Sequence, residues 1–283
     1  INVGCGGRLK RDPFSGTTSE FVRMIDLLPM IDAHIHLDQY SDRDIQDIIE
    51  ENRQVGVEAL ITVSTNKASA ERNLQLSHVD PSVFPAFGFH PEQALPTEQE
   101  QHALLSWMEE NRRHMIAVGE VGLPYYLRQK QEVDMDAYRE LLTVFIQKAA
   151  LWNLPIVLHA VYDDADVACD LLESYSVKRA HFHWFKGSDK TVERLAANGY
   201  HISFTPDICY KATRRSLVKS YPLELIMVET DGPWPFAGPF KGKQTRPKLI
   251  HQSLETIANA RQMRLGELSS IIRHNTRKFY QLR

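Results

Sequence analysis

The 283-residue chain has few cysteines, no long apolar stretch and almost no excess of one charge. Its three cysteines, at 5, 169 and 209, are odd in number and far apart, so no disulfide framework is indicated. We expect Cys169 and Cys209 to be small buried residues of a cytoplasmic protein. No apolar run reaches the ~18–20 residues of a membrane-spanning helix, so no membrane association is expected.

The charge balance excludes a second class of protein. Lysine and arginine total 33, and aspartate and glutamate total 36, which leaves a formal net charge of -3. A protein held to nucleic acid by its overall charge is basic, so this balance argues against that class, while a local basic patch stays open.

Residues 1–23 differ in composition from the rest of the chain. They are rich in Gly, Ser, Thr and charged residues and show no periodic apolar pattern. They also lack the continuous apolar segment of a signal peptide, so we expect no export. We interpret 1–23 as a disordered extension or a vector-derived tail, with a regulatory tail as the alternative. The expected single domain spans 24–283.

Short apolar runs alternate with longer amphipathic stretches from residue 30 onward. The runs are rich in Ile, Val and Phe, which is typical of parallel strands buried on both faces. They span 30–37, 57–63, 83–89, 116–123, 156–161, 180–185, 200–204 and 225–229. Eight strands alternating with helices predict an α/β protein with a TIM-type (β/α)8 barrel. An open doubly wound sheet is the alternative, but no glycine-rich phosphate fingerprint follows any run.

Helix signals lie between the runs. Ser41 and Ser188 each precede an amphipathic stretch and are expected to be N-caps, and Gly199 is expected to follow the end of the second of these helices. Apolar residues repeat at helical spacing over 138–149. Two further helices are expected near the end of the chain, through 254–258 and 268–279.

Residues that bind metals lie at the ends of five of these runs, where the chemistry of a barrel is expected. They are His34 and His36, Glu120, His159, His181 and His183, and Glu229 and Asp231. Residues two apart on a strand share a face, so His34 and His36 should point together into the barrel mouth. Imidazoles with interleaved carboxylates suit Zn²⁺ or another divalent ion, or two ions that share one carboxylate.

Each of these residues also has a purely structural explanation. His159 by itself could be a hydrogen-bonded structural residue, and Glu120 by itself could be a solvated loop acid. The whole set favours the metal site, because burying so many ionisable groups without a cation would be costly. His181 and His183 share a face, so geometry leaves open which of them is the ligand.

Six motifs carry a resemblance to a known family. They are D-A-H-I-H at 32–36, G-F-H-P at 88–91, G-E-V-G-L at 119–123, P-I-V-L-H at 155–159, H-W-F-K-G at 183–187 and E-T-D-G-P at 229–233. In order and spacing the chain resembles the TatD family of metal-dependent hydrolases, the TatD-type deoxyribonucleases among the amidohydrolase-like barrels. The segment H-N-T-R-K-F-Y at 274–280 also resembles the closing segment of that family.

The resemblance implies a site with two divalent ions, whether Zn²⁺, Mg²⁺ or Mn²⁺. One ion would be held by His34, His36, Glu120 and Asp231, and the other by Glu120, His159 and His183, with Glu120 bridging them. His183 is preferred to His181 because the sixth-strand pattern of the family is His-Cys-Phe-Ser-Gly. Glu229 would lie close by, where it could instead support a ligand.

The activity implied by the resemblance is hydrolysis of phosphodiester bonds in DNA, exonuclease-like, by a water activated by two metal ions. The expected catalytic residues are Asp231, which accepts the proton of the water or orients it, with Glu120 and His90. The expected substrate is single-stranded DNA or another phosphodiester. Candidate substrate contacts are His90, Lys186, Trp184 and Arg246.

Several positions depart from the family pattern. Pro124 replaces an aspartate, Lys186 replaces the serine of the sixth-strand motif, Val161 replaces an arginine, and Thr245-Arg246-Pro247 replaces an Asn-Glu-Pro-like segment. The metal ligands match, so the departures concern the substrate more than the metal chemistry. Two alternatives stay open: a metal-dependent hydrolase of an ester or amide, including an aminoacyl-tRNA ester, and a metal-binding protein that has lost catalysis.

Overall fold

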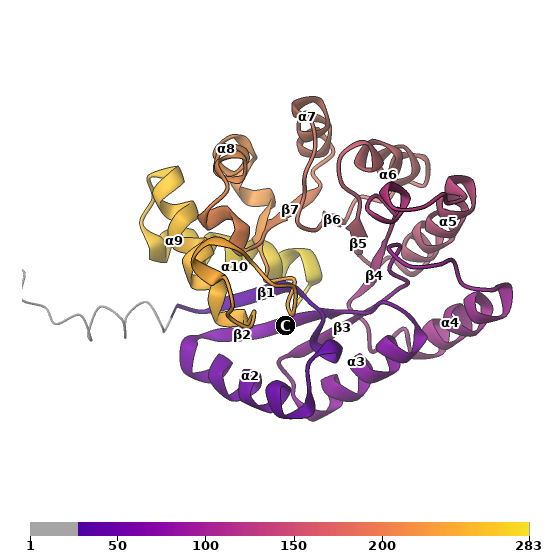
Figure 1. Cartoon of the computed structure of the whole chain (residues 1–283), viewed down its shortest axis with the longest axis horizontal. Coiled ribbons are helices and arrows are strands. Elements are labelled where there is room, and N and C mark those ends of the chain that lie inside the picture. Colours follow the sequence, from indigo (N-terminus) through magenta and orange to yellow (C-terminus); the bar gives the residue numbers. More distant parts are fainter. Residues whose placement is uncertain (1–27, 283) are drawn as a thin grey trace, which may run out of the picture.

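The computed structural model of the chain describes residues 28–282, so the expectation for residues 1–23 lies outside the described residues. One sheet of eight parallel strands runs in the order β1 to β8 and is surrounded by helices (Figure 1). The strands are β1 Met30–Ile35, β2 Val57–Val63, β3 Val83–Phe87, β4 Ala117–Gly122, β5 Ile156–His159, β6 Ala180–Phe182, β7 His201–Phe204 and β8 Ile226–Val228. This order confirms the predicted (β/α)8 arrangement.

Helices connect the strands, and two more follow the last strand. The α-helices are α2 Asp42–Val55, α3 Lys67–Val79, α4 Glu98–Asn111, α5 Met135–Trp152, α6 Asp163–Ser174, α7 Asp189–Ala197, α8 Ala212–Ser220, α9 Ile250–Arg261 and α10 Leu265–Tyr280. Short 3-10 helices cover Leu37–Gln39, Leu127–Gln129, Pro206–Cys209, Leu223–Leu225, Gly238–Phe240 and Pro247–Leu249. Within residues 28–282, no helix combines the length and the apolarity of a membrane span.

The predicted helix signals are confirmed. Ser41 and Ser188 cap α2 and α7, because each hydroxyl accepts the backbone N–H three residues ahead. Gly199 follows α7 with a φ of 73°, in the left-handed region that glycine adopts at little cost. The apolar positions predicted over 138–149 are buried in α5.

The barrel is completed where β1 meets the segment that follows β8. The Asp231 N–H donates to the His34 carbonyl (2.9 Å), and the His36 N–H donates to the Gly232 carbonyl (2.8 Å). These bonds bring the two ends of the sheet together at the carboxyl ends of the strands, so the barrel is nearly closed.

Most of the predicted strands extend too far toward their carboxyl ends. The runs 30–37, 83–89 and 180–185 continue past the observed ends of β1, β3 and β6. The residues beyond those ends are apolar because they are buried, as Leu37 and Phe185 show, and not because they belong to the sheet. His36, His183 and Asp231 therefore lie in loops just beyond the ends of β1, β6 and β8 and not within the sheet. The loop backbone sets the directions of their side chains.

Among residues 28–282, buried apolar residues form three clusters, the smallest of which joins Phe236, Phe240 and Leu249. A large cluster fills the space between the strands and the surrounding helices. A second cluster joins small residues of β1 to β5 and β8, and because residues from so many strands meet there, it fills the barrel interior. Phe279 and Tyr280 of α10 belong to this interior cluster. Cys169 is fully buried, as predicted, whereas Cys209 is only partly buried.

Candidate metal centre

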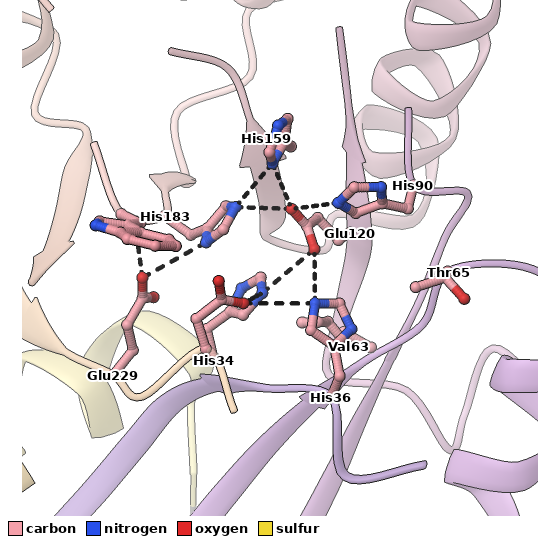
Figure 2. Close-up of polar contacts among 12 residues, drawn as sticks. His34, His36, Val63, Thr65, His90, Glu120, His159, His183 and Glu229 are labelled. Atoms are coloured by element: carbon pink, nitrogen blue, oxygen red, sulfur yellow. Dashed lines mark hydrogen bonds and ion pairs between the residues drawn. The ribbon is translucent and has the colours of Figure 1, made fainter. Parts of the chain in front are cut away.

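Six predicted ligands converge at the carboxyl ends of the strands, with Glu120 of β4 at the centre (Figure 2). They are His34 of β1, His36 just after it, Glu120, His159 at the end of β5, His183 after β6, and Asp231 after β8. All six are less than a tenth exposed. Residues almost 200 positions apart in the chain therefore form one buried cluster.

The two carboxylate oxygens of Glu120 face different groups of histidines. Its Oε2 lies 3.3 Å from the Nε2 atoms of both His34 and His36. Its Oε1 lies 3.0 Å from His159 Nδ1 and 2.7 Å from His183 Nε2. This is the division between the two sets that the resemblance implied, with Glu120 shared.

Asp231 completes the first group. Its Oδ1 lies 3.4 Å from His34 Nε2 and 3.5 Å from His36 Nε2. An ion in tetrahedral coordination with bonds of ~2.0–2.1 Å has ligand atoms about 3.3–3.4 Å apart. The distances from the two nitrogens to the two oxygens are therefore those expected between ligands of one small divalent ion. His34 and Asp231 are also spaced to share an ion with His183.

Several buried atoms of the cluster have no hydrogen-bond partner among the described residues. They are both ring nitrogens of His34, Nδ1 of His36 and of His183, and Oε2 of Glu120. A buried polar atom without a partner costs free energy, and a cation would satisfy the lone pairs of several at once. The imidazole and carboxylate donors, their spacing and these unpartnered atoms fit divalent metal ions.

The carboxylates and imidazoles shift each other's pKa values. Burial by itself would raise the pKa of Glu120, but His183 and the histidines around it hold that pKa well below its usual range. Burial would lower the pKa of His36, but the neighbouring carboxylates of Asp231 and Glu120 raise it to about 9. Protons on the histidines thus balance the carboxylates when no metal is bound, and metal ions would displace them.

The structure separates His181 from His183. His181 Nδ1 lies 2.8 Å from the Tyr280 hydroxyl, and its Nε2 lies 2.7 Å from Ser203 Oγ, so both ring nitrogens are occupied. Burial holds its pKa well below the usual value, so His181 is a neutral structural residue. Of these two histidines, His183 is the one that faces Glu120, and it is also the one that the family resemblance favoured as a ligand.

Two further carboxylates hold the histidines in place. Glu229 Oε1 lies 3.5 Å from His183 Nδ1 (Figure 2) and accepts the N–H of Trp184 at 2.8 Å. Glu92 Oε1 lies 3.1 Å from His159 Nε2, on the side of the ring away from Glu120. Carboxylates of this kind orient metal-binding histidines. Sequence reasoning missed Glu92, although it directly follows the G-F-H-P motif.

His90 lies at the edge of the cluster. Its Nε2 is 3.5 Å from Glu120 Oε1, and its Nδ1 accepts the backbone N–H of Glu92 at 3.1 Å. Burial lowers the pKa of His90 to about 3, so this residue is neutral at physiological pH. It can therefore offer an N–H to a substrate but no positive charge. Its spacing from Glu120 and His159 also makes it a further candidate ligand.

A cavity of about 810 Å³ opens over the cluster. His36, His90, His159, His183 and Asp231 form one part of its wall, and Trp184, Lys186, Tyr210, Trp234 and Phe236 form another. Arg246 is not among the lining residues, because its guanidinium pairs with Asp44 at 3.3 Å. Of the predicted substrate contacts, the structure thus brings His90, Trp184 and Lys186 to the cavity and leaves Arg246 outside it.

Comparisons with known proteins show the family of the chain. The sequence model of a family described as TatD related DNase matches residues 31–281. The chain is 37% identical over 255 residues to an uncharacterized metal-dependent hydrolase of Haemophilus influenzae, covering 89% of this chain and 100% of the relative. It is 30% identical over 266 residues to human deoxyribonuclease TATDN3, covering 89% of this chain and 94% of the relative.

A solved structure supports the fold. The crystal structure of YJJV, a TatD homologue of Escherichia coli, matches with a TM-score of 0.81 at 24% identity, over 91% of this chain and 100% of the other. These findings define the protein as a metal-dependent hydrolase built on an α/β barrel. More narrowly, the chain belongs to the TatD family.

Proposed function

We propose that this protein hydrolyses phosphodiester bonds of DNA and acts at the end of a single strand, as an exonuclease does. The proposal rests on the position of the Glu120 carboxylate, whose two oxygens face separate groups of imidazole nitrogens. Two ions that share a carboxylate suit phosphoryl transfer, in which both the attacking and the leaving oxygen need stabilisation. The name of the human relative, a deoxyribonuclease, supports the same substrate class.

The residues that would hold the ions follow from the geometry. His34, His36 and Asp231 with Glu120 Oε2 would hold one ion, and His159 and His183 with Glu120 Oε1 would hold the other. When bound, the ions lower the pKa of water toward ~7 and neutralise charge on phosphoryl oxygens. Zn²⁺, Mg²⁺ and Mn²⁺ all accept mixed imidazole and carboxylate ligands, so the donor set leaves the metal open.

The protein's own side chains supply the remaining chemistry. Close contacts with His34 and His36 outweigh the effect of burial and hold the pKa of Asp231 below its usual range, so its carboxylate is ionised and can orient a water by accepting a hydrogen bond from it. His90 has its Nδ1 occupied by the Glu92 N–H, so its Nε2 carries the proton and can donate it in a hydrogen bond to a phosphoryl oxygen.

The cavity supports action at a strand end. Its volume of about 810 Å³ falls within the roughly 300–1,000 Å³ of pockets that take small ligands, which suits a terminal nucleotide better than a duplex. Trp234, more than half exposed at the cavity wall, offers a surface on which a base can stack.

Metal-free protein titrated with Mn²⁺, Mg²⁺ or Zn²⁺ and assayed on 3′-labelled and 5′-labelled single-stranded DNA tests the proposal. We expect metal-dependent release of nucleotides from one end. Hydrolysis of ester or amide substrates with no attack on DNA would instead support the alternative hydrolase. Bound metal with no activity on any of these substrates would support a protein that has lost catalysis.

A further inference from the structure

Lys186 is a buried cation without a carboxylate partner. Its side chain lies in the loop after β6, and the residue is only 8% exposed. Its Nζ donates to the Tyr126 hydroxyl at 2.8 Å and lies 4.0 Å from the centre of the Trp184 ring. Among residues 28–282, Lys186 forms no ion pair within 4.0 Å, and the one hydrogen bond of its Nζ is to Tyr126. Buried ammonium groups are normally paired with an anion. We therefore expect Lys186 to bind an anionic group of a ligand.

Asp207, a carboxylate whose charge acts on Lys186, already has other partners. Asp207 pairs with Lys211 at 3.2 Å and with Arg214 at 3.3 Å, and it accepts the Trp184 indole N–H at 3.0 Å. Asp207 is therefore shared by two other cationic side chains, Lys211 and Arg214, and forms no ion pair with Lys186. Lys186 itself lines the cavity together with the candidate metal ligands.

Neighbouring contacts hold Lys186 in position. The backbone N–H of Tyr162 donates to the Lys186 carbonyl at 2.5 Å, and Arg214 donates to the carbonyl of Phe185. The Trp184 ring stabilises the ammonium through a cation–π contact. Because Lys186 lies over the Trp184 ring, the lysine occupies that ring. Trp234 is then the tryptophan of the cavity on which a base can stack.

Lys186 and Tyr126 line the same cavity as the ligands His159, His183 and Asp231. The Tyr126 oxygen accepts a hydrogen bond from Lys186, so its own O–H is free to donate to a ligand. An ammonium and a hydroxyl donor side by side suit a phosphoryl group, which carries several acceptor oxygens and negative charge.

We propose that Lys186 and Tyr126 form an anion subsite that binds a second phosphate of the nucleotide substrate, distinct from the phosphate that is hydrolysed. The inference rests on the proposed function, since it names the substrate of the same cavity. It makes Lys186, which stands where the family pattern has serine, a specificity-determining residue. The preferred substrate then carries a further phosphate beside the scissile bond.

Binding tests the subsite independently of hydrolysis. The probes are deoxyadenosine 3′,5′-bisphosphate, which has no phosphodiester bond, and the two corresponding monophosphates, measured by calorimetry with Mn²⁺ present. We expect the bisphosphate to bind about 10- to 100-fold more tightly than either monophosphate, as a charge-assisted hydrogen bond predicts. The variant Lys186→Met should lose this difference, and Tyr126→Phe should lose part of it.

A matched control is Lys148→Met. Lys148 also lies over a tryptophan, Trp152, but it does not line the cavity. This variant should keep the full difference between the probes. Equal binding of the bisphosphate and the monophosphates by the wild type, or an unchanged difference in Lys186→Met, would overturn the subsite.

A kinetic experiment distinguishes the anion subsite from the proposed hydrolysis of DNA. On dinucleotides with and without a terminal phosphate, kcat/KM should favour the phosphorylated form, and Lys186→Met should reduce that ratio about tenfold or more. Hydrolysis of both dinucleotides at equal rates would refute the subsite and leave the proposed function standing. Failure to hydrolyse either one, with the binding difference intact, would refute the proposed function and leave the subsite standing.

Discussion

At the scale of single residues, the chemistry depends on how each donor atom is supported. Glu120 divides its two oxygens between histidine groups, and Asp231 is aimed at His34 and His36 by a backbone hydrogen bond from its own N–H to His34. Glu92 holds His159 from behind. Substitutions at these positions should therefore affect different quantities: turnover, metal affinity or substrate preference.

Asp231→Asn removes one negative charge from the first group and changes the acceptor that orients the water. We expect kcat on DNA to fall about 10²- to 10⁴-fold, the usual contribution of a side chain that assists proton transfer. The amide keeps the size of the side chain, so circular dichroism should match that of the wild type. Turnover close to that of the wild type would remove Asp231 from the mechanism.

Glu92→Gln weakens the support of His159 without touching the ions' own ligands. We expect the affinity for metal to fall about 10- to 100-fold, because outer carboxylates set the orientation and basicity of a ligand histidine. Competition with a chromogenic chelator measures this affinity. Glu132→Gln, at an exposed position that does not line the cavity, is the control and should bind metal as the wild type does.

The subsite should also depend on pH. Burial, with the positive charge of Arg214, lowers the pKa of Lys186 from 10.5 to about 8. The charged groups that act on Lys186 are Arg214, Lys211, Asp207 and Asp231. Tyr126, whose pKa burial raises to about 12, stays neutral. The ammonium is therefore present below pH 8 and lost as the pH rises through that value.

The preference for the bisphosphate over the monophosphates should accordingly shrink between pH 7 and pH 9. Phosphate monoesters keep their charge over this range, since their second pKa is about 6. Lys186→Arg stays protonated and should retain its preference at pH 9. If the wild-type preference for the bisphosphate does not change between pH 7 and pH 9, the Lys186 ammonium is not the group that causes it.

At the scale of elements, the join between β1 and the segment after β8 positions ligands from both sides. The Asp32 carboxylate accepts the N–H of Thr230 at 2.9 Å and also its hydroxyl, and it accepts the N–H of His34 at 3.3 Å. One buried carboxylate thus ties together the two chain segments that carry His34 and Asp231. Loss of this tie should affect both the stability of the barrel and the alignment of the site.

Thr230→Val tests the join with little change in shape. It removes a buried hydroxyl that donates to Asp32, and leaves that carboxylate with one partner fewer. We expect the free energy of unfolding to fall by about 1–3 kcal/mol, measured by urea denaturation. Thr143→Val in α5, whose hydroxyl bonds only to the carbonyl of Arg139, should cost less.

At the scale of the whole molecule, the ligands come from five strand ends and span most of the chain. Ions bound there link distant parts of the barrel and neutralise buried carboxylates. Ion binding to the folded chain alone contributes about 2.7 kcal/mol when free metal is 100 times its Kd. For a chain of this length we expect removal of metal by a chelator to lower Tm by about 5–10 °C.

Calorimetry with and without added Mn²⁺ or Zn²⁺ measures that change. His34→Gln removes a ligand and serves as the control, because added metal should shift its Tm less. A wild-type Tm that is the same with chelator and with excess metal would argue that no ion is bound at this cluster.

Local patterns were sufficient for the barrel and for placing most of the candidate ligands at strand ends. Alternation of apolar runs with amphipathic stretches depends on burial, which acts on each segment, so the order of strands and helices could be predicted. Spacing within D-A-H-I-H put His34 and His36 on one side because a strand repeats every two residues. The ends of the strands were less predictable, since buried loop residues such as Leu37 have the same composition as strand residues.

The sequence by itself thus determined the fold, the candidate ligands and the chemistry they suit. Only the tertiary structure decided which side chains face one another. It separated His181 from His183, placed Glu92 behind His159, left Arg246 outside the cavity and buried Lys186 within it. The physical reason is that composition and period depend on neighbours along the chain, whereas the direction of a loop side chain depends on partners far away in sequence.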